Sequence, residues 1–547
     1  MRNTRLFFLF PMLLLMVFMS GCLRKSSQGN SPGSTVTLSK EKLHDKIRGG
    51  WAGQTIGVVY GAPVEFKFQG SLINEYQNIP WNDGNVKYWW DKKPGLFDDV
   101  YTDLNFVEAF EKYGLDVSRD TIAAHWARTS YHLAHANQAS RYNILNGIMP
   151  PASGNWKNNP HADDLDFQIE ADFIGLMCPG LVNKSSEIAD RTGHIMNSGD
   201  GWYGGVFVAA LYSLAFISDD PQDIVEQALK NIPQQTTFHQ CIADVLSWHQ
   251  EHPGDWKATW FELQKKWDRD VGCPKGVFLS FNIDAKINSA YVALALLYGQ
   301  GDFTRSVDIA TRCGQDADCN AATVGGVLGV MHGYSGIPEF WSKPLSEIEP
   351  LNFEGTSMSL EKAYALSYKH ALGILQKAGV DTAAANLAIP VTEPVPVAFE
   401  QNFDQCYPIS REKIDQSYTG SFSFEFTGNG YILYGNLIKR SKIDTNYIDR
   451  VAKKLGTEVF GLAEPEDPYV AELKIYINDR LDETVRLPMK NSARRLEPAW
   501  KYQLPEGHYR VRIDWLNPDP GYELRINDRV IYSSVKPTGN IPNTATF

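Results

Sequence analysis

The chain has 547 residues, of which 43% are hydrophobic, 12% aromatic and 21% charged. This composition excludes a wholly disordered, collagen-like or coiled-coil chain, and the length predicts at least two domains. The 64 acidic side chains outnumber the 52 lysines and arginines and give a net charge of −12. That balance argues against a general nucleic-acid binder, because such proteins need a basic surface. Seven cysteines are too few for a disulfide scaffold of this size.

The N-terminal segment is expected to lie outside the fold. Two arginines precede an apolar run, Leu6–Met19, which is shorter than the about 20 residues of a membrane span and typical of a signal peptide over residues 1–21. Met19–Cys22 resembles a bacterial lipobox in which Cys22 is lipidated, with a plain signal peptide as the alternative. Residues 22–38 are polar, like a flexible tether. We expect an exported protein, lipid-anchored to a bacterial membrane on its periplasmic or outer-membrane face.

Residues 39–385 show a helical pattern. Apolar side chains recur at helical spacing over residues 100–110, and Gly114 ends that segment. Stretches rich in alanine and glycine follow at 204–216, 287–299 and 321–333. Such small side chains let helices approach closely. The sequence therefore predicts a compact all-α domain.

The pattern changes at a proline-rich linker, residues 386–400. From residue 401 to residue 547, apolar side chains alternate in short runs separated by turn residues, which predicts an all-β sandwich. Two similar segments, Ile477–Arg480 and Ile526–Arg529, are both predicted to be hairpin turns. The expected fold is thus multidomain, with an all-α domain followed by an all-β sandwich.

Two acidic clusters stand out in the helical domain. Asp98 and Asp99 open one predicted helix, and Asp316 and Asp318 open another. Helix capping alone explains one aspartate at each start. Two pairs meeting in one cleft would repel each other unless a cation lay between them, and Mg²⁺ prefers such oxygen ligands. A calcium loop is rejected because Val327 stands where its last ligand, a glutamate, is required.

Four segments in order carry a family resemblance. They are Gly50–Glu65, Phe97–Val100, Gly314–Ala322 and Gly336–Trp341. Together they resemble the motifs of the ADP-ribosylglycohydrolase family, which includes the dinitrogenase-reductase-activating and ADP-ribosyl-acceptor hydrolases. The resemblance extends from about Leu38 to Gly373.

This resemblance implies an all-α domain with two Mg²⁺ ions, or one as the alternative, held by Asp98, Asp99, Asp316 and Asp318. Glu65 matches the acidic residue near the substrate ribose. The reaction would cleave a glycosidic bond through an oxocarbenium-like state, and the metal would orient sugar hydroxyls and activate water. A carboxylate displaced from the metal, from Glu65, Asp99 or Asp316, is the candidate base.

The metal motifs depart from the family pattern. Gln54 replaces an aspartate, and Phe97, Val100 and Cys319 replace threonines. Three hydroxyl oxygens near the metal are therefore missing. Residues 102–103, one turn further on, are candidates to replace them, or the metal keeps more water.

The central motif also differs, because Ile169–Pro179 lacks the family's arginine. An acidic run at 161–166 precedes it, for which a solvated surface is the alternative. Glu170 and Asp172 lie in an otherwise apolar stretch and are candidate substrate-binding residues, as is Asp200, although a turn explains that aspartate equally well. Such an acidic pocket would repel a pyrophosphate, so we expect that the sugar has changed while the chemistry is retained.

Three functions are therefore carried forward. The first is a Mg²⁺-dependent glycosidic hydrolase of the ADP-ribosylglycohydrolase type, and the second is the same fold acting on an exported glycoside or N-glycoside without ADP-ribose. The third is a non-catalytic surface lipoprotein that binds a ligand or a glycan. Aromatic residues of the sandwich allow stacking on sugar rings; they are Trp500, Tyr502, Trp515 and Tyr522. The expected partners are a small-molecule or glycan substrate and the membrane, without nucleic acid, for a monomeric protein.

Overall fold

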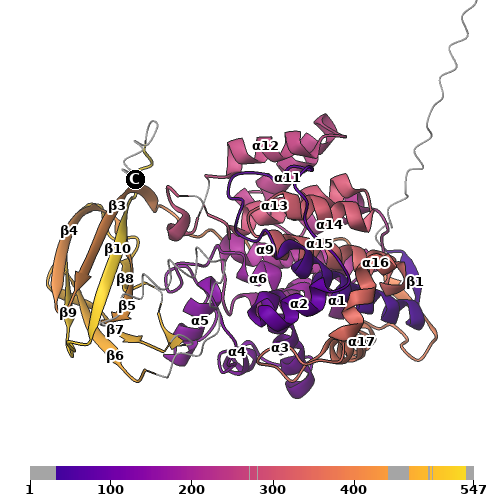
Figure 1. The fold of residues 1–547 in the computed structure, drawn as a ribbon, viewed down its shortest axis with the longest axis horizontal. Helices are drawn as coiled ribbons and strands as arrows, with labels where there is room; N and C mark the ends of the chain where they lie inside the picture. Colours follow the sequence, from indigo (N-terminus) through magenta and orange to yellow (C-terminus); the bar gives the residue numbers. More distant parts are fainter. Residues whose placement is uncertain are drawn as a thin grey trace, which may run out of the picture.

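The computed structural model describes residues 33–269, 272–279, 281–440, 467–490, 493–495 and 497–537. A helical part and a strand-rich part lie side by side along the long axis of the molecule (Figure 1). This order confirms the predicted all-α domain followed by an all-β domain. The predicted signal peptide, the lipidation site Cys22 and residues 22–32 of the predicted tether lie outside the described residues.

The helical part extends from Lys40 to Lys377. Its helices are α1 (Lys40–Gly61), α2 (Asn85–Lys92), α3 (Asp98–Tyr113), α4 (Arg119–Trp126), α5 (His135–Leu145), α6 (Asp166–Ile169), α7 (Asp172–Met177), α8 (Val182–Gly193), α9 (Gly199–Ala215), α10 (Pro221–Leu229), α11 (Thr237–Glu251), α12 (Trp256–Trp267), α13 (Ala285–Gly299), α14 (Phe303–Arg312), α15 (Ala317–His332), α16 (Glu339–Ser342) and α17 (Leu360–Lys377). Short 3-10 turns are η1 (Pro94–Phe97), η2 (Pro274–Gly276), η3 (Tyr334–Gly336) and η4 (Lys343–Glu347).

Helices α1 and α15 pack antiparallel at unusually short range. Glycines recur every fourth residue on α1, at Gly49, Gly53, Gly57 and Gly61, so they share one face of the helix. A Cβ atom at any of the first three would lie 2.0–2.2 Å from a backbone oxygen of α15. At Gly61 it would lie 2.3 Å from the Cα atom of Asp318. The absence of side chains on this face therefore sets where the acidic start of α15 lies.

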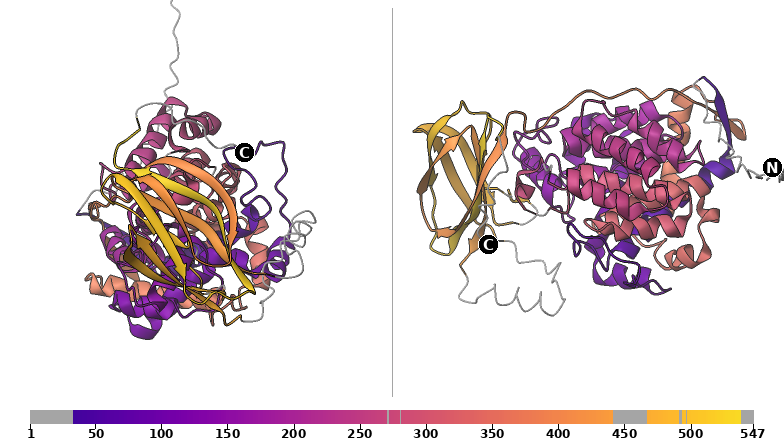
Figure 2. Two further views of the ribbon diagram at one scale, coloured as in Figure 1. Left: turned by 90° about the vertical axis from the view of Figure 1, so that its left-hand side faces the viewer. Right: turned by 90° about the horizontal axis from the view of Figure 1, so that it is seen from above.

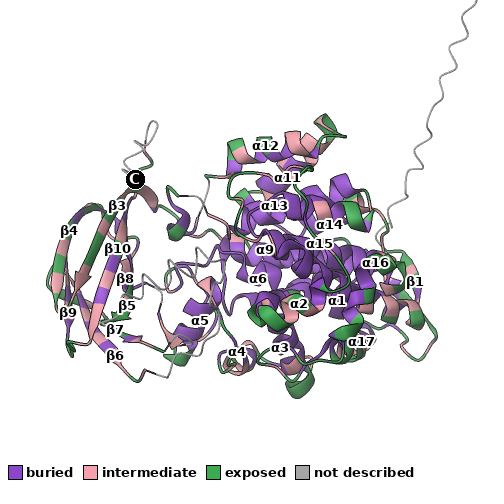
Figure 3. Ribbon diagram, in the orientation of Figure 1, coloured by how far each residue is buried: buried purple, intermediate pink, exposed green. Residues whose placement is uncertain are grey.

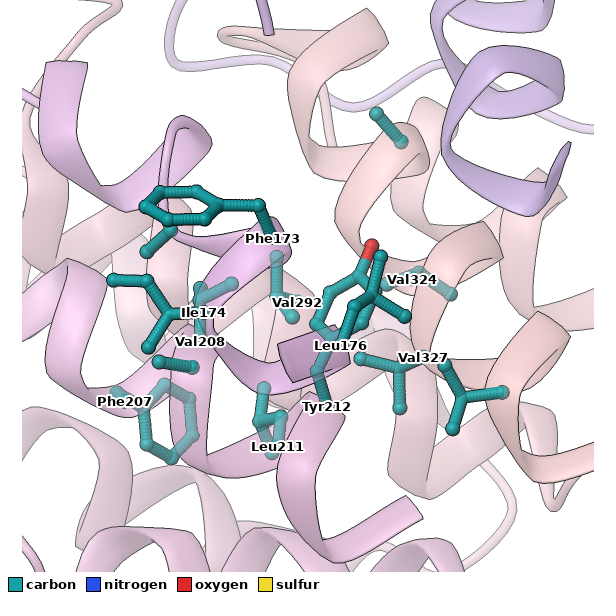
Figure 4. Packing of buried hydrophobic residues seen from close by; sticks show 14 of the residues in the cluster. Phe173, Ile174, Leu176, Phe207, Val208, Leu211, Tyr212, Val292, Val324 and Val327 are labelled. Carbon is teal, nitrogen blue, oxygen red and sulfur yellow. The ribbon is translucent and has the colours of Figure 1, made fainter. Parts of the chain in front are cut away.

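The central helices of this domain are almost completely enclosed (Figure 3). Helices α9, α13 and α15 are buried over nearly their whole length, as expected for helices that are apolar all round. Their side chains meet in one core, where Phe173 of α7, Tyr212 of α9, Val292 of α13 and Val324 of α15 lie close together (Figure 4). Side chains of α3 and α15 both belong to this core, which fixes the positions of the acidic motifs at the starts of these helices.

A short two-stranded sheet closes the helical domain. Strand β1 (Thr35–Ser39) pairs antiparallel with β2 (Asn386–Pro390). The predicted tether over residues 22–38 therefore ends in a strand, and the predicted linker over 386–400 begins with its partner. Both segments alternate exposed and buried side chains, a pattern that the sequence prediction overlooked because each strand is only five residues long.

The rest of the linker lies along the helical domain. The amide of Val397 donates a hydrogen bond to the carbonyl of Asn231 at 2.8 Å. The carboxylate of Glu400 lies 3.0 Å from Nε2 of His194 and accepts a hydrogen bond from the amide of Gly199 at 2.9 Å. Proline removes backbone donors, which suits an extended segment at a surface. These contacts make the segment a fixed strap between the two domains.

The strands beyond the strap are β3 (Tyr407–Tyr418), β4 (Phe422–Gly428), β5 (Gly430–Lys439), β6 (Val470–Ile477), β7 (Arg480–Pro488), β8 (Ala499–Lys501), β9 (Gly507–Trp515) and β10 (Tyr522–Ser533). They form two four-stranded antiparallel sheets, in the orders β3-β10-β5-β8 and β4-β9-β6-β7. Apolar side chains from both sheets share one core. The β-sandwich prediction is therefore correct.

One of the two predicted hairpin turns is wrong. Asn478 and Asp479 do join β6 to β7, with φ values of 49° and 63° that suit the tight turn of a hairpin. In contrast, residues 526–529 lie inside β10, where the pairing shifts between Ile526 and Asp528. This shift is a β-bulge, which accommodates one extra residue without reversing the chain.

Aromatic side chains join the two domains, which lie end to end (Figure 2). Trp156 of the helical domain clusters with Phe403 and Tyr502, with ring centroids 5.2 and 5.5 Å away. The indole nitrogen of Trp500 donates to the carbonyl of Lys157 at 2.9 Å. Two of the four aromatic residues considered for glycan stacking therefore serve the contact between domains.

Two further features of the described part of the chain are its cysteines and the apolar character of its helices. All six described cysteines are buried and free of disulfide bonds. Among the described residues, none of the helices combines the length and the apolar character that a membrane span requires.

Candidate metal centre

The first aspartate pair follows directly from a 3-10 turn. Turn η1 runs into α3, so that Asp98 and Asp99 occupy its first turn, after Phe97 at the N-cap position. No side chain caps this helix start. Asp98 is half-buried and Asp99 is 1% exposed. Capping therefore does not explain the pair, because neither carboxylate occupies the N-cap.

The second pair lies at the start of α15. Asp316 is the N-cap residue of this helix but makes no side-chain capping bond. The two preceding residues, Gly314 and Gln315, both adopt positive φ values, of 81° and 59°, and a Cβ on Gly314 would lie 2.6 Å from the carbonyl oxygen of Phe68. This tight turn places Asp316 and Asp318 in the interior, where they are 2% and 1% exposed.

The two pairs meet around Cys319. Its Sγ atom and one oxygen each of Asp98 and Asp99 all lie within 4.8 Å of one another. The same holds for Sγ and the oxygens of Asp316 and Asp318. The thiol donates a hydrogen bond to Oδ1 of Asp99 at 3.2 Å. Two aspartate pairs that are more than 200 residues apart in the chain thus form one cluster.

Burial and mutual repulsion act strongly on these carboxylates. Burial and the nearby Glu65 raise the pKa of Asp98 to about 7. Burial raises the pKa values of Asp99, Asp316 and Asp318 well above the usual range, and charges of neighbouring carboxylates add to the effect. Without a cation the cluster therefore favours bound protons, because charged carboxylates at this distance repel each other.

A lysine that the sequence did not lead us to expect lies at the solvent-facing edge of the aspartate cluster, which we call its rim. Lys93 precedes η1 and pairs with Glu65 at 2.5 Å. The fields of Glu65, Asp318 and Asp98, against the effect of burial, raise the pKa of Lys93. Its side chain is 25% exposed and that of Glu65 is 18% exposed, so the cluster opens to solvent on this side. A basic residue five positions before an acidic motif was the available signal.

Next to the clustered aspartates lies a buried polar network. Gln54, which stands where the family has an aspartate, donates to Oδ2 of Asp103 at 3.2 Å. The hydroxyl of Tyr212 donates to Oδ2 of Asp172 at 2.7 Å. Burial raises the pKa of Asp172 to about 8, and burial together with the charge of Asp172 raises that of Asp103. The structure therefore places Asp172 in this network, where its partners are protein groups.

Glu170 lies nearer to the ligands. It is 1% exposed and accepts a short hydrogen bond from Asn137, while its Oε2 atom has no partner among the described residues. Burial, Asp166, Asp98 and Asp99 all raise its pKa. A buried oxygen without a hydrogen bond costs free energy. Glu170 is therefore a candidate to form a hydrogen bond with a bound ligand.

Asp200 belongs to a different cluster. It lies 3.6 Å from the ammonium of Lys286 and accepts a hydrogen bond from Thr237 at 3.3 Å. Its amide donates to Asp163 at 3.1 Å. Asp200, at the start of α9, therefore contacts the loop of Asp163, helix α11 and helix α13. Glu65 and Glu170, in contrast, lie within the electrostatic influence of the clustered aspartates.

The donor set fits a hard divalent cation. Oδ1 of Asp316 and Oδ1 of Asp318 have no hydrogen-bond partner among the described residues, and the nearest cationic side chain on the rim, Lys93, is paired with Glu65. Oxygen ligands of this kind suit Mg²⁺. A cation would also remove the repulsion that raises the pKa values of these carboxylates.

Comparison with known proteins shows the family of the chain. The family model described as ADP-ribosylglycohydrolase matches residues 39–369, which include both aspartate pairs. No curated protein sequence matches the chain. A solved structure titled "ADP-ribosylglycohydrolase-related protein complex" is 15% identical, covers 60% of this chain and 98% of its own, and has a TM-score of 0.40. Because the family match spans more than half of the sequence, the chain belongs to the ADP-ribosylglycohydrolase family, a family of hydrolases of glycosidic bonds.

Proposed function

We propose that this protein is a Mg²⁺-dependent hydrolase of a glycosidic bond. The observation that carries the proposal is the convergence of two aspartate pairs, from α3 and α15, in one partly open cluster. Asp98, Asp99, Asp316 and Asp318 would hold the metal, as two ions or as one. When bound, Mg²⁺ would supply a positive charge that orients sugar hydroxyls and activates water.

The chain's own groups define the remaining roles. Glu65 adjoins the aspartates and is held by Lys93 at 2.5 Å, so its carboxylate is positioned to accept a proton from a nucleophilic water. Asp98 is half-buried, whereas Asp99 is enclosed. Substrate would therefore approach from the side of Asp98, Glu65 and Lys93. Glycosidic cleavage develops positive charge on the sugar ring, which the surrounding carboxylates favour.

The buried Glu170 favours a substrate other than ADP-ribose. Its unpartnered oxygen lies close enough to Asp98 and Asp99 for their charges to act on it, and the family's arginine is absent from this segment. A carboxyl group at this position accepts hydrogen bonds from hydroxyls or amines, and unlike an arginine it offers no positive charge to a pyrophosphate. We therefore place a neutral or cationic glycoside, or an N-glycoside, first among the candidate substrates.

We further propose that the protein acts after export, tethered to a bacterial membrane through a lipid on Cys22. The basis is the lipobox-like sequence at 19–22. Metabolic labelling with a fatty-acid probe tests this directly. Label on the wild-type chain but not on Cys22→Ala supports the anchor, and equal labelling of both would exclude it.

A substrate screen tests the proposed activity. Purified protein is incubated with Mg²⁺ or EDTA and with ADP-ribosylated peptides, nucleosides and oligosaccharides, and the release of free sugar is measured. We expect Mg²⁺-dependent release that is lost in Asp316→Ala and kept in Asp116→Ala, whose aspartate is exposed and pairs with Lys377. Rapid release of ADP-ribose would overturn the changed-sugar assignment, and EDTA-resistant turnover would overturn the metal role.

A further inference from the structure

A second group of metal-binding side chains lies at the junction of the two domains. His135 begins α5, and His161 and Asp164 belong to the loop that follows this helix. One donor atom of each lies within 4.8 Å of the other two. A fourth donor, Sγ of Cys273, lies 3.9 Å from Nδ1 of His161. Two nitrogens, an oxygen and a sulfur therefore converge; we call these four residues the junction cluster.

The spacing of these atoms is close to that of a metal site. Nδ1 of His161 lies 2.8 Å from Oδ2 of Asp164, and Nδ1 of His135 lies 3.8 Å from the same oxygen. Donor atoms of a tetrahedral zinc site are about 3.3–3.8 Å apart, given metal–ligand bonds of about 2.0–2.3 Å. Small rotations of the side chains would thus suffice to enclose an ion.

The cluster is buried and incompletely hydrogen-bonded. His161 and Asp164 are 1% and 0% exposed. Oδ1 of Asp164 and Nδ1 of His135 lack hydrogen-bond partners in the part of the chain that the structure describes. The side chain of His135 is 28% exposed, which leaves a path for an ion. Unpaired donors of these types suit zinc better than magnesium.

A carboxylate from the sandwich orients one of the histidines. Nε2 of His161 lies 2.8 Å from Oε1 of Glu497, a residue just before β8. A proton on Nε2 would leave the lone pair of Nδ1 facing Asp164 and Cys273. This is the usual support for a metal-binding histidine, in which a carboxylate fixes the tautomer through the other ring nitrogen.

His194 provides a comparison without a metal. It also lies between two carboxylates, with Nδ1 3.1 Å from Asp190 and Nε2 3.0 Å from Glu400. A protonated ring satisfies both contacts there. A protonated His161 would likewise satisfy Asp164 and Glu497, but it would leave Nδ1 of His135 without a hydrogen-bond partner among the described residues. That nitrogen and the nearby thiol of Cys273 distinguish the junction cluster from a simple ion pair.

The loops that carry the donors are held across the domain boundary. Arg411 of β3 donates to the carbonyls of Lys275 and Val277 at 2.9 and 3.0 Å, next to Cys273. Gln138 of α5 donates to the carbonyl of Arg494 at 2.9 Å, close to Glu497. An ion bound in the cluster would therefore stabilise the contact between the helical domain and the sandwich.

We propose that the junction cluster binds one Zn²⁺ ion through His135, His161, Asp164 and Cys273. Cys273 binds as a thiolate and releases its proton to solvent. The role is structural, since all four positions around the metal are protein ligands. This site is independent of the proposed hydrolase activity, because none of its ligands belongs to the carboxylate cluster.

Cobalt titration of the full chain tests the proposal. Protein stripped with EDTA is titrated with Co²⁺ in excess Mg²⁺, and absorption spectra are recorded before and after addition of Zn²⁺. We expect one equivalent of tetrahedral Co²⁺ with a thiolate-to-metal band, displaced by Zn²⁺. Cys273→Ser should remove that band, and Glu497→Gln should keep it while weakening zinc about 10–100-fold.

The matched control is Cys319→Ser, because that thiol adjoins the carboxylate site and is the other plausible source of a thiolate band. The band should persist in this variant and in Asp316→Asn. A band that follows Cys319, or a wild-type titration without tetrahedral Co²⁺, would overturn the proposal. If Cys273→Ser does not fold, the wild-type spectrum and Glu497→Gln decide the question.

Discussion

Two polar clusters in the same molecule differ in their ligands and in their supports. The carboxylate site offers oxygens from five acidic residues, with Lys93 as the neighbouring cation. The junction cluster offers two imidazoles, one carboxylate and one thiol. Oxygen donors suit Mg²⁺, whereas mixed nitrogen and sulfur donors suit Zn²⁺. One chain therefore contains two clusters whose donor atoms suit different metal ions.

The contrast extends to access and rigidity. The carboxylates stand at the starts of α3 and α15. Glycine contacts hold α15 against α1, and the cluster opens beside Glu65 and Lys93. The ligands of the junction cluster come mainly from loops, and a residue of the other domain supports them. A metal that must meet substrate needs an open position, while a structural metal is closed. The open carboxylate site is thus suited to binding a substrate, and the enclosed junction cluster is suited to holding the two domains together.

The largest expected effect follows from removing one ligand carboxylate. Asp318→Asn should lower kcat/KM by about 10³-fold, equivalent to about 4 kcal/mol, because an amide oxygen does not replace the charge that holds the metal. Steady-state kinetics with an Mg²⁺ titration measures this. Zinc binding at the junction cluster should stay unchanged in the same variant. Activity within tenfold of wild type would remove Asp318 from the site.

The glycine contact gives the next prediction. Gly61→Ala places a Cβ 2.3 Å from the backbone of Asp318, so we expect unfolding free energy to fall by about 1–3 kcal/mol and Mg²⁺ affinity to fall with it. Urea unfolding and Mg²⁺ titration measure the two effects. Gly254→Ala is the control, because a Cβ there meets no atom within 4 Å. Equal stability of both variants would contradict the close contact of α1 and α15.

The pH dependence of metal binding separates the site from a simple acidic surface. The pKa of Asp98 is raised to about 7 by burial and by Glu65, so the folded metal-free protein binds more protons than the unfolded chain. Its stability therefore falls as pH rises from about 4 through 7. Mg²⁺ binding should tighten over the same range, by up to about tenfold per pH unit for each proton released. Thermal shift assays at pH 5.5, 7 and 8.5 measure the increase in melting temperature that Mg²⁺ causes. An increase that does not depend on pH would contradict the coupling of Mg²⁺ binding to proton release.

The smallest expected effect concerns the strap. Although burial opposes the charged ring, Asp190 and Glu400 raise the pKa of His194 to about 9. The stabilisation is thus complete below about pH 6.5 and is lost as pH rises through about 9. Glu400→Gln should cost about 1 kcal/mol of unfolding free energy at pH 6 and less at pH 10.

Glu393→Gln is the control for that experiment, because Glu393 forms an exposed pair with Lys230 and such pairs contribute little. An effect of Glu400→Gln that is the same at both pH values would show that His194 is uncharged.

Sequence patterns sufficed for the parts of the fold that depend on local spacing. Helical periodicity and two acidic motifs predicted where α3 and α15 begin and that their aspartates meet. Lys93 was not predicted, because its sequence signal, a position five residues before Asp98, does not by itself distinguish it from a surface lysine. Residues 526–529 have the composition of a turn, yet they form a bulge because β10 is paired on both sides there. Turn residues alone do not show whether a strand reverses.

Local sequence patterns did not predict the contacts between segments that are far apart in the chain. His161 and Glu497 are 336 residues apart in the chain, and each on its own resembles many polar loop residues. The network that links Gln54 to Asp103 and Asp172 to Tyr212 draws on several helices. Packing between the domains brings the first pair together, and packing between helices brings the second set together. The family motifs indicated the reaction centre, but they carried no information about the junction.

The pairing of β1 with β2 has a consequence for how the molecule is presented. These strands lie at the end of the helical domain that is remote from the sandwich (Figures 1 and 2). A chain held to a surface by its N-terminus would therefore carry the helical domain next to that surface and extend the sandwich outward. The strap spans the length between them as a fixed segment. In such an arrangement the sandwich would be the part of the molecule farthest from the surface.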